Sequence, residues 1–499
     1  MNLQQFFNSK GYDISEKIYW DPYLYLWNSW YRGKVRDFHT YFVYNGQYKV
    51  RREKKSLQGA KKTCEDWADL LFNEKVRISL KAQDSTKKLE NIFERNNATV
   101  LINQGVEKSF SLGIGALVVS VQNMSFIEEK NILDITNAKI SLEFINGQAI
   151  YPLSWQGGEI KECAFVSYKT INKKTYMYVS MHIIDELGNY VIENYKFECS
   201  GRNKSILSSF INDSDNFLEK FDTHSNIPWF SIIKPNLANN IDENTPFGIS
   251  IFANAIDVLK SLDNSYNELD NELILGRRRT FVSEQMMTYD NGVEQMTFDP
   301  EDISIYRMPK NFNKDGMINH DSTELRTDKI QSAVQFNLNM LSAKVGFGND
   351  RYKFDGNTIQ TATGVISENS DMFRTLKKHE QVLESSLKTI ITAVAYASST
   401  FTKEKIDASE ITIDFDDSII EDKGAQRVSA QQEVTAGLRS KLDYLQNIRG
   451  FGKEQAEQEL QRIQDEKISN QEAFGFLDTN NAINTEEKEN DNDNKEEEE

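Results

Sequence analysis

The fold is decided by the stretch TPFGISIFANAIDVLKSLDNSYNELDNELIL at residues 245–275, together with its return partner TDKIQSAVQFNLNMLSAKV at residues 327–345. Apolar residues recur at helical spacing in both stretches, and Pro246 suits an early helical position after Thr245. We expect a helix over 249–275 and a second helix over 327–345. A helix, an inserted β unit and a returning helix would form a rod with a small β unit at its end, available to a partner.

The insertion between these helices carries strand and turn signals. Alternating runs occupy 280–289, 293–298 and 303–308, and AspAsnGly at 290–292 separates the first two. Asp-Asn-Gly between alternating runs predicts a tight β-hairpin. Arg277, Arg278 and Arg279 follow the first helix directly. They either complement the helix dipole at its C-terminus or contact nucleic acid or an acidic partner.

Composition bounds the class of protein. The chain has 499 residues and a net charge of −18. Nine acidic residues and two lysines in 485–499 give that tail −7, so the remaining residues carry −11. Such a protein does not hold nucleic acid by bulk attraction. Three dispersed cysteines favour reduced thiols over a disulfide or metal site. No signal peptide is evident, and no apolar run approaches the roughly 18 residues of a membrane span. We therefore expect a soluble compartment.

Helical and strand patterns alternate along the N-terminal half. Trp20, Leu24, Trp27 and Trp30 form an aromatic strip at helical spacing, with Pro22 expected at an early helical position. The strip indicates a helix whose strip is core or, less commonly, a ligand surface. Helices are expected at 60–80, ending near Asn73, and at 84–105. Strands are then predicted at 114–121, 138–145, 163–170, 175–184, 190–198 and 227–236.

The C-terminal third begins with a Gly- and Asn-rich stretch, 346–357, that predicts an exposed loop. Basic and aromatic residues interleave in it, as in loops that touch a nucleic-acid backbone, although acidic residues interrupt them. A long helix follows from Thr358 or Thr361 to about Thr400, then a strand at 411–418. Residues 423–467 predict a helical hairpin broken at 450–452, and the chain after about Asn480 is expected to be disordered.

Catalytic signatures are weak. The sequence has no phosphate-binding GxxxxGK[ST] loop, no GxSxG and no HExxH, and its five histidines are isolated. Asp414, Asp416 and Asp417 could hold Mg²⁺ as in a nuclease, but Asp417 points to the opposite side of the strand from the other two. A solvated strand end is the alternative. We expect no enzymatic activity, no cofactor and no metal.

Four strings together resemble the portal proteins of tailed bacteriophages, in the family typical of phages of low-GC Gram-positive bacteria. They are WFSIIKPN (229–236), TPFGISIFANAIDVLKSLD (245–263), TATGVISENSDMFRT (361–375) and IDFDDSIIEDK (413–423). The order of parts agrees over essentially the whole chain. The resemblance implies an α+β portal fold: a mixed α/β wing, a two-helix stem, a small α/β clip and a helical crown, assembled into a ring.

The resemblance also implies a layout. The expected parts are the wing (1–246), stem helix 1 (247–276), the clip (277–326), stem helix 2 (327–345), the channel or tunnel loop (346–357), a long helix with a wing strand (358–422), crown helices (423–475) and an acidic tail (476–499). The implied channel-loop residues are Phe347, Asn349, Asp350, Arg351, Tyr352, Lys353 and Phe354. The implied docking residues of the clip are Arg277, Arg278, Arg279, Met286, Met287 and Tyr306.

The function implied is a ring of usually twelve subunits at one capsid vertex of the virion, assembled in the host cytoplasm. Double-stranded DNA passes through it without sequence specificity during packaging and ejection. Implied partners are further copies of the chain, the terminase large subunit, the head-completion adaptor, and the major capsid and scaffolding proteins, with no membrane. The alternative is another head–tail connector or tail ring without a packaging role.

Overall fold

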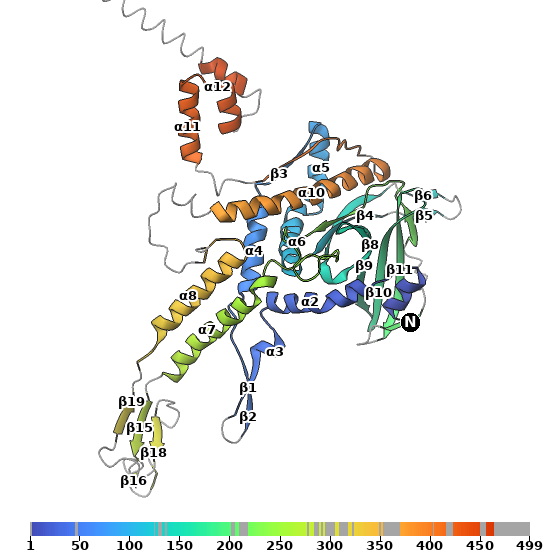
Figure 1. Ribbon diagram of the computed structural model, residues 1–499. Helices are drawn as coiled ribbons and strands as arrows, with labels where there is room; N and C mark the ends of the chain where they lie inside the picture. The colour runs from blue at the N-terminus through green and yellow to red at the C-terminus, as the bar shows by residue number, and fades with distance from the viewer. Residues whose placement is uncertain are drawn as a thin grey trace, which may run out of the picture. The chain divides into compact units, whose positions relative to one another are not determined.

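The computed structural model describes residues 2–44, 48–123, 125–127, 132–134, 137–200, 205–208, 218–276, 279–283, 289–290, 293–294, 305–308, 318–321, 324–348, 351–352, 370–402, 404–415, 423–449 and 456–463. They form a mixed α/β structure in two compact units, Met1–Asp416 and Asp417–Glu499 (Figure 1). Each unit is described by itself below.

Helices dominate both ends of the first unit and the described residues of the second. Their bounds are α1 (Leu3–Ser9), α2 (Ser15–Tyr31), α3 (Arg36–His39), α4 (Gly59–Leu71), α5 (Gln83–Arg95), α6 (Ala98–Leu112), α7 (Ile256–Leu275), α8 (Thr327–Lys344), α10 (Ser370–Phe401), α11 (Lys423–Thr435) and α12 (Lys441–Asp443). Short 3₁₀ segments span Gly147–Ala149 and Ala253–Ala255, and a π-helical turn spans Tyr444–Ile448.

Most of the described strands of the first unit lie between α6 and α7 in the sequence. They are β1 (Thr40–Tyr44), β2 (Lys49–Glu53), β3 (Arg77–Leu80), β4 (Gly115–Gln122), β5 (Ser125–Ile127), β6 (Ile132–Asp134), β7 (Lys139–Asn146), β8 (Ile150–Gln156), β9 (Glu159–Ile171), β10 (Lys174–Ile184), β11 (Tyr190–Ser200), β12 (Ser205–Ser208), β13 (Lys220–Asp222), β14 (Phe230–Ile233), β15 (Arg279–Ser283), β16 (Tyr289–Asp290), β17 (Val293–Glu294), β18 (Ile305–Met308), β19 (Ile318–Asp321) and β20 (Ile411–Asp414).

Two antiparallel sheets form the centre of this unit. The larger has the order β12-β11-β10-β9-β8, with β13 also paired to β11, and the smaller has the order β14-β4-β7. Phe6 and Phe7 of α1 pack on one face of the larger sheet, against Met177, Val179 and Phe197. Helix α10 packs on the smaller sheet, where Ser386 donates a hydrogen bond to the carbonyl of Ile232 at 2.7 Å. The antiparallel β part predicted from alternation is confirmed.

The aromatic strip of α2 is core. Trp20, Leu24, Trp27 and Trp30 are all at most 2% exposed, and the Trp20 ring stacks on Phe247 with centroids 5.8 Å apart. The expected position of Pro22 was wrong. Helix α2 begins at Ser15, so Pro22 lies inside it, on an exposed side where water can replace the backbone hydrogen bond that proline cannot donate.

Two expected helix limits were also wrong. The helix predicted at 84–105 is two helices, because Asn97 adopts a left-handed conformation (φ 49°) between α5 and α6. The helix predicted from residue 249 begins at Ile256. Residues 249–252 are extended or turned because their backbone bonds elsewhere: the Ile251 amide donates to the carbonyl of Phe110 at 2.9 Å.

That extended segment is held against the end of α6 by a glycine pair. Gly113 caps α6 with φ +77°, and a Cβ built on it would lie 2.5 Å from the carbonyl oxygen of Gly248. A Cβ on Gly248 would lie 2.5 Å from the Gly113 oxygen in turn. The two backbones approach so closely that neither position has room for a side chain. This contact fixes where α7 leaves the sheet-bearing part of the chain.

The remaining predictions concern the C-terminal third of the chain. The long helix is confirmed over Ser370–Phe401, while its expected first residues fall outside the described part. The 411–418 strand is β20, which pairs with β3 and ends at Asp414. In the second unit, the predicted break at 450–452 is outside the described residues. α11 ends at Thr435 instead, two residues before Gly437, whose φ is +74°.

Candidate functional site

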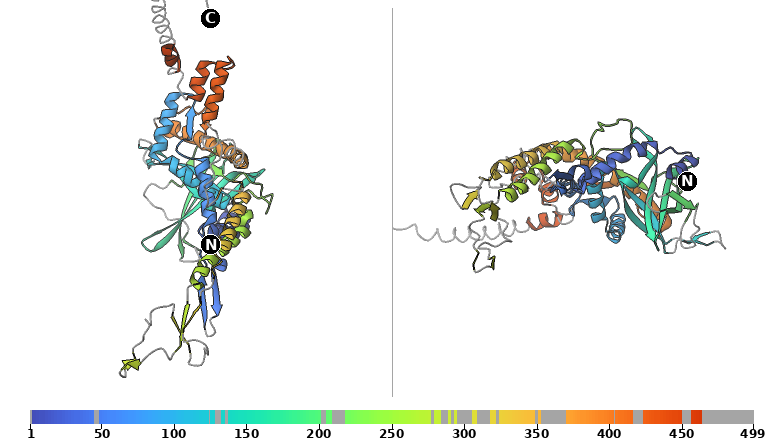
Figure 2. Two further views of the ribbon diagram at one scale, coloured as in Figure 1. Left: turned by 90° about the vertical axis from the view of Figure 1, so that its left-hand side faces the viewer. Right: turned by 90° about the horizontal axis from the view of Figure 1, so that it is seen from below.

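Helices α7 and α8 form an antiparallel pair, side by side in Figures 1 and 2. Polar contacts join them at both ends and in the middle. Lys344 Nζ lies 3.2 Å from Asp257, Asn337 Nδ2 donates to Ser265 Oγ at 3.1 Å, and Arg326 lies 2.7 Å from Glu272. The sequence numbers of each pair rise on α7 as they fall on α8, which fixes the antiparallel register. The predicted helix–return helix rod is therefore present.

The pair rests on α4 at its first residue, Gly59. A Cβ on Gly59 would meet the side chains of Leu341, Leu262 and Leu259 at 3.0 to 3.2 Å. All three leucines are buried. Glycine at the start of α4 therefore lets leucines from both helices of the pair pack against its backbone.

The contact between Glu272 and Arg326 closes the other end of the pair. Arg326 donates to the Glu272 carboxylate through its backbone amide at 3.0 Å and its guanidinium at 2.7 and 3.3 Å. These hydrogen bonds lower the pKa of Glu272 to about 2. Helix α7 carries five acidic residues and one lysine. These five acidic side chains contact Lys344, His39, Arg326 and Lys55 of the described chain, so their charge is largely offset by neighbours.

The chain after α8 turns back into the core. Gly346, at φ +90°, ends the helix, and the ring of Phe347 stacks on Trp67 of α4 with centroids 4.3 Å apart. Trp67 Nε1 donates to the carbonyl of Val345 at 3.1 Å. Phe347 is 2% exposed. Its implied place in an exposed DNA-facing loop does not fit this burial, because the aromatic partner in α4 draws it inward.

Two further residues of the expected loop are described. Tyr352 is half-buried, its carbonyl accepts from Gln335 Nε2 at 2.8 Å, and burial raises the pKa of its hydroxyl. Arg351 is exposed, with its guanidinium carbon 5.7 Å from the centroid of the Phe347 ring. Of the expected loop residues, these two and Phe347 are thus brought together at the end of α8. Asn349, Asp350, Lys353 and Phe354 lie outside the described residues.

Between α7 and α8 the described segments form a small sheet of order β18-β15-β19. β15 runs parallel to β18 and antiparallel to β19. Arg279 lies on β15 opposite Asp321, and Tyr306 lies on β18 opposite Phe281. The predicted hairpin is confirmed in its paired ends, Tyr289 with Glu294 and Asp290 with Val293. Arg277, Arg278, Met286 and Met287 lie outside the described residues.

His379 of α10 packs against Trp67, the ring on which Phe347 stacks. Its ring contacts Trp67 and Phe110 edge-on, each at a centroid distance of 5.0 Å, and its Nδ1 accepts from the Asn236 amide at 3.0 Å. Burial lowers the pKa of His379 to about 3, so the imidazole is neutral at pH 7. One neutral ring thus joins α10 to α4, α6 and the segment after β14.

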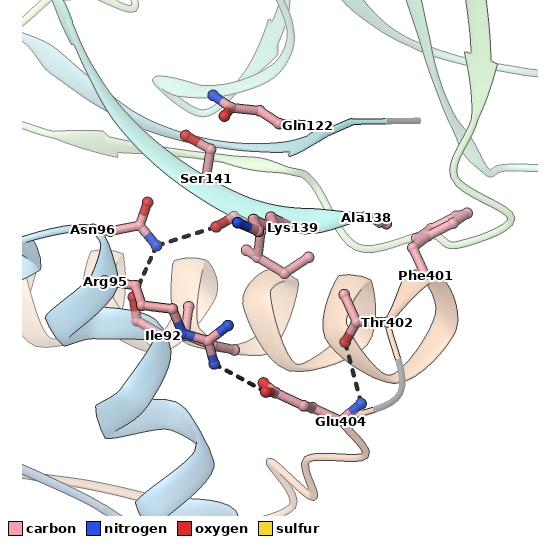
Figure 3. A pocket seen from close by; sticks show the side chains of 11 residues that line it. Ile92, Arg95, Asn96, Gln122, Ala138, Lys139, Ser141, Phe401, Thr402 and Glu404 are labelled. Carbon is pink, nitrogen blue, oxygen red and sulfur yellow. Dashed lines mark hydrogen bonds and ion pairs between the residues drawn. The ribbon is translucent and has the colours of Figure 1, made fainter. Parts of the chain in front are cut away.

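A pocket of about 630 Å³ lies between α5, β7 and the end of α10 (Figure 3). Some of its polar groups are already bonded: Arg95 pairs with Glu404 at 2.9 Å, and Asn96 Nδ2 donates to the Ile140 carbonyl at 3.1 Å. No nucleophile and base are paired among its lining residues.

The nuclease alternative gains no support from the described residues. Asp414 is exposed at the end of β20, opposite Arg77 of β3, and Asp416 and Asp417 lie outside the described part. Within the described ranges no three His, Cys, Asp or Glu side chains come close enough to hold a metal ion. Cys64, Cys163 and Cys199 are buried, and none of them forms a disulfide within the described residues. Among described helices, none is long and apolar enough to cross a membrane.

Sequence reasoning missed the contacts that position the helix pair. Trp67 lies on the buried face of α4, within the helix predicted at 60–80, but nothing in its spacing indicates a partner 280 residues away in sequence. The Glu272–Arg326 contact spans 54 residues and crosses the β insertion. Such pairs carry no periodic signal, and an alignment showing that the two positions change together is the observation that finds them.

One of the comparisons with known proteins shows which family the chain belongs to. No curated protein matches the chain. Among solved structures, a chain titled "Neck of native GTA particle computed with C12 symmetry" matches at 11% sequence identity, covering 78% of this chain and 88% of that chain, with a TM-score of 0.38. The family model for phage portal proteins, SPP1 Gp6-like, matches residues 17–473. The chain therefore belongs to the SPP1 Gp6-like family of phage portal proteins.

Proposed function

We propose that the chain is the subunit of a portal ring, usually of twelve copies, at one vertex of a phage capsid. The observation that carries this proposal is the family match over residues 17–473, which takes in the α7–α8 pair and both segments that flank it. The family is structural rather than enzymatic and implies a component of the virion. Double-stranded DNA passes through the ring during packaging and ejection.

In this proposal α7 and α8 are the stem that lines the channel. At 1.5 Å per residue their 20 and 18 residues reach about 30 and 27 Å. The sequence predicts a longer first helix over 249–275, whereas α7 is similar in length to α8. The net charge of −18 makes the chain as a whole repel phosphate, which suits a wall along which DNA must slide without being held.

The remaining parts follow the layout that the sequence implied. Residues 1–246 and the 358–422 segment form the wing, 277–326 the clip, and 423–475 the crown. We keep Arg351 and Tyr352, with the undescribed residues 349, 350, 353 and 354, as the channel-loop candidates. Phe347 becomes the buried residue that anchors the start of that loop.

The clip is the proposed docking site for the terminase large subunit and later for the head-completion adaptor. Arg277, Arg278, Arg279, Met286, Met287 and Tyr306 are its candidate contacts. The test is retention of terminase by the full-length ring, compared with a variant in which all three arginines are replaced by serine. Loss of binding with an intact ring supports the proposal.

A matched control replaces three charged wing residues far from the clip in sequence, Lys61, Lys62 and Lys88, by serine. Equal loss of terminase in this control contradicts a specific clip site. An intact wild-type ring that retains no terminase favours the alternative function, a connector ring without a packaging role.

A further inference from the structure

The hairpin β1–β2 is poorly buried for an ordered element. Every residue of β2 is exposed, and on β1 Phe42 and Tyr44 are 58% and 70% exposed. The pairing of Phe42 with Arg51 and Tyr44 with Lys49 puts both rings on one face. An isolated two-stranded hairpin is marginal in water at best. A hairpin with large apolar side chains on a solvent-exposed face therefore needs a partner.

The hairpin is nevertheless fixed in place. The segment that follows β2 runs along α7: Leu57 N donates to Asp263 Oδ1 at 2.8 Å, Lys55 N donates to Asn267 Oδ1 at 3.2 Å, and Lys55 Nζ donates to Asp270 Oδ1 at 2.6 Å. At the base of the hairpin, His39 Nε2 lies 2.9 Å from the second oxygen of buried Asp263. These contacts hold the hairpin at a set position beside the stem.

Helix geometry places the hairpin and α8 on opposite sides of α7. Residues 263, 267 and 270 fall on one side of a helix with 3.6 residues per turn, whereas 265 and 272, which contact α8, fall on the other. Figure 1 shows this arrangement, with α7 between α8 and the β1–β2 hairpin. Within one copy of the chain, the hairpin therefore cannot reach α8.

Among the described residues, nothing covers an apolar stripe on α8. Ala333, Phe336, Met340 and Ala343 follow one another at intervals of three and four residues and are all exposed, Phe336 at 65%. They face neither α7, which Asn337 contacts, nor the core, into which Val334 and Leu338 are buried. Spacing of three and four is that of helix surfaces that pack against a partner.

We propose that the hairpin of one subunit packs on the α8 stripe of the next subunit, with Phe42 and Tyr44 against Phe336 and Met340. The inference rests on the proposed ring, and it names the surfaces that join neighbouring copies at the stem. Two different patches on opposite sides of one subunit form a head-to-tail contact, which repeats and closes into a ring when the rotation allows.

The proposed ring supports a second copy as the occupant, because each copy in a ring meets its neighbours through two different sides. The five acidic side chains of α7 already contact Lys344, His39, Arg326 and Lys55 of the same copy. The hairpin strands carry a net charge of +2 and α8 carries +1, so apolar contact rather than opposite charge joins the two surfaces. Burial of the aromatic rings provides most of the contact energy.

The test is disulfide cross-linking of the full-length chain carrying both Phe42→Cys and Phe336→Cys. The native cysteines are buried, so background cross-linking is low. A head-to-tail contact predicts a ladder of dimers, trimers and higher species on a non-reducing gel. An equimolar mixture of the two single variants, assembled together, predicts dimers only, because each copy then has one half of the contact. A second pair, Tyr44→Cys with Met340→Cys, guards against misfolding of the first.

The control pair is Phe42→Cys with Leu187→Cys, since Leu187 is 85% exposed in a turn between β10 and β11. It predicts no ladder. Mass photometry of the same samples separates the inference from the ring itself. Rings that give no ladder with either pair overturn the inference alone, whereas particles that never exceed one subunit overturn the proposed ring as well. Dimers from Phe42→Cys alone would show that hairpins meet hairpins, which also overturns it.

Discussion

Replacing Phe347 by alanine discriminates between a packing role and a DNA-contact role for this residue. Its ring is 2% exposed and stacks on fully buried Trp67 at 4.3 Å. Truncating a buried phenylalanine to alanine costs about 3–5 kcal/mol, of which the aromatic pair accounts for about 0.5–1.5 kcal/mol. We therefore expect the unfolding free energy of the subunit to fall by about 3–5 kcal/mol. Phe347→Leu, which keeps most of the volume but loses the ring pair, should cost about 1.5 kcal/mol.

The assay is urea unfolding of the monomeric full-length chain, isolated by size exclusion and followed by tryptophan fluorescence. Tyr25→Ala is the matched control, because Tyr25 is 69% exposed on α2 and an exposed substitution changes stability by about 0.5 kcal/mol or less. If Phe347→Ala unfolds at the same urea concentration as this control, Phe347 is not a packing residue. The same result would restore it to the exposed loop that the sequence implied.

Three further changes test the structure elsewhere. Burial lowers the pKa of His182 to about 3, so the unfolded chain binds the proton first, and the stability present above pH 6.5 is lost as pH falls towards 3. At pH 5 the loss of unfolding free energy is about 2 kcal/mol. The wild-type urea midpoint should therefore be lower at pH 5 than at pH 7.5, and His182→Phe should remove the part of this difference that is due to His182. An unchanged difference contradicts the burial of a neutral ring. Glu272→Ala should speed hydrogen exchange at the end of α7 and the start of α8, and unaltered exchange would show that the contact with Arg326 does not hold the pair. Gly113→Ala should cost about 1–3 kcal/mol or more, measured by thermal unfolding, because its Cβ would meet the backbone of Gly248; wild-type stability would show that the two backbones can separate.

Local pattern was sufficient where it coincided with burial. The α2 strip, the alternating strands and the α7–α8 pair were predictable because helical and strand periods appear directly in the sequence. The limits of α7 were not predictable, because the Ile251 amide bonds to Phe110 in a helix 141 residues earlier, and local propensity carries no information about that partner. The split at Asn97 depends on one left-handed residue that asparagine tolerates but does not require.

The candidate site was less predictable than the fold. A Gly-bounded segment with aromatic and basic residues indicates an exposed loop, yet Phe347 packs inward, because Trp67 of α4 provides a matching ring. The hairpin β1–β2 was not predicted as a separate element. The helix stripe formed by Asp263, Asn267 and Asp270, which fixes its base, looks like an ordinary solvated helix face in the sequence. Polar side chains that bind a neighbouring segment of the chain, here residues 55–57, have the same spacing as polar side chains that face water.

The central claim, a ring with an axial channel lined by α7 and α8, is tested most directly by electron microscopy of the purified full-length protein viewed down the particle axis. With a subunit of 57.5 kDa, twelve copies give about 690 kDa, which mass photometry of the same sample checks. The proposal predicts class averages with rotational symmetry around a central hole wide enough for duplex DNA. Closed particles without a hole, or single subunits at micromolar concentration in the presence of scaffolding and capsid protein, would contradict it.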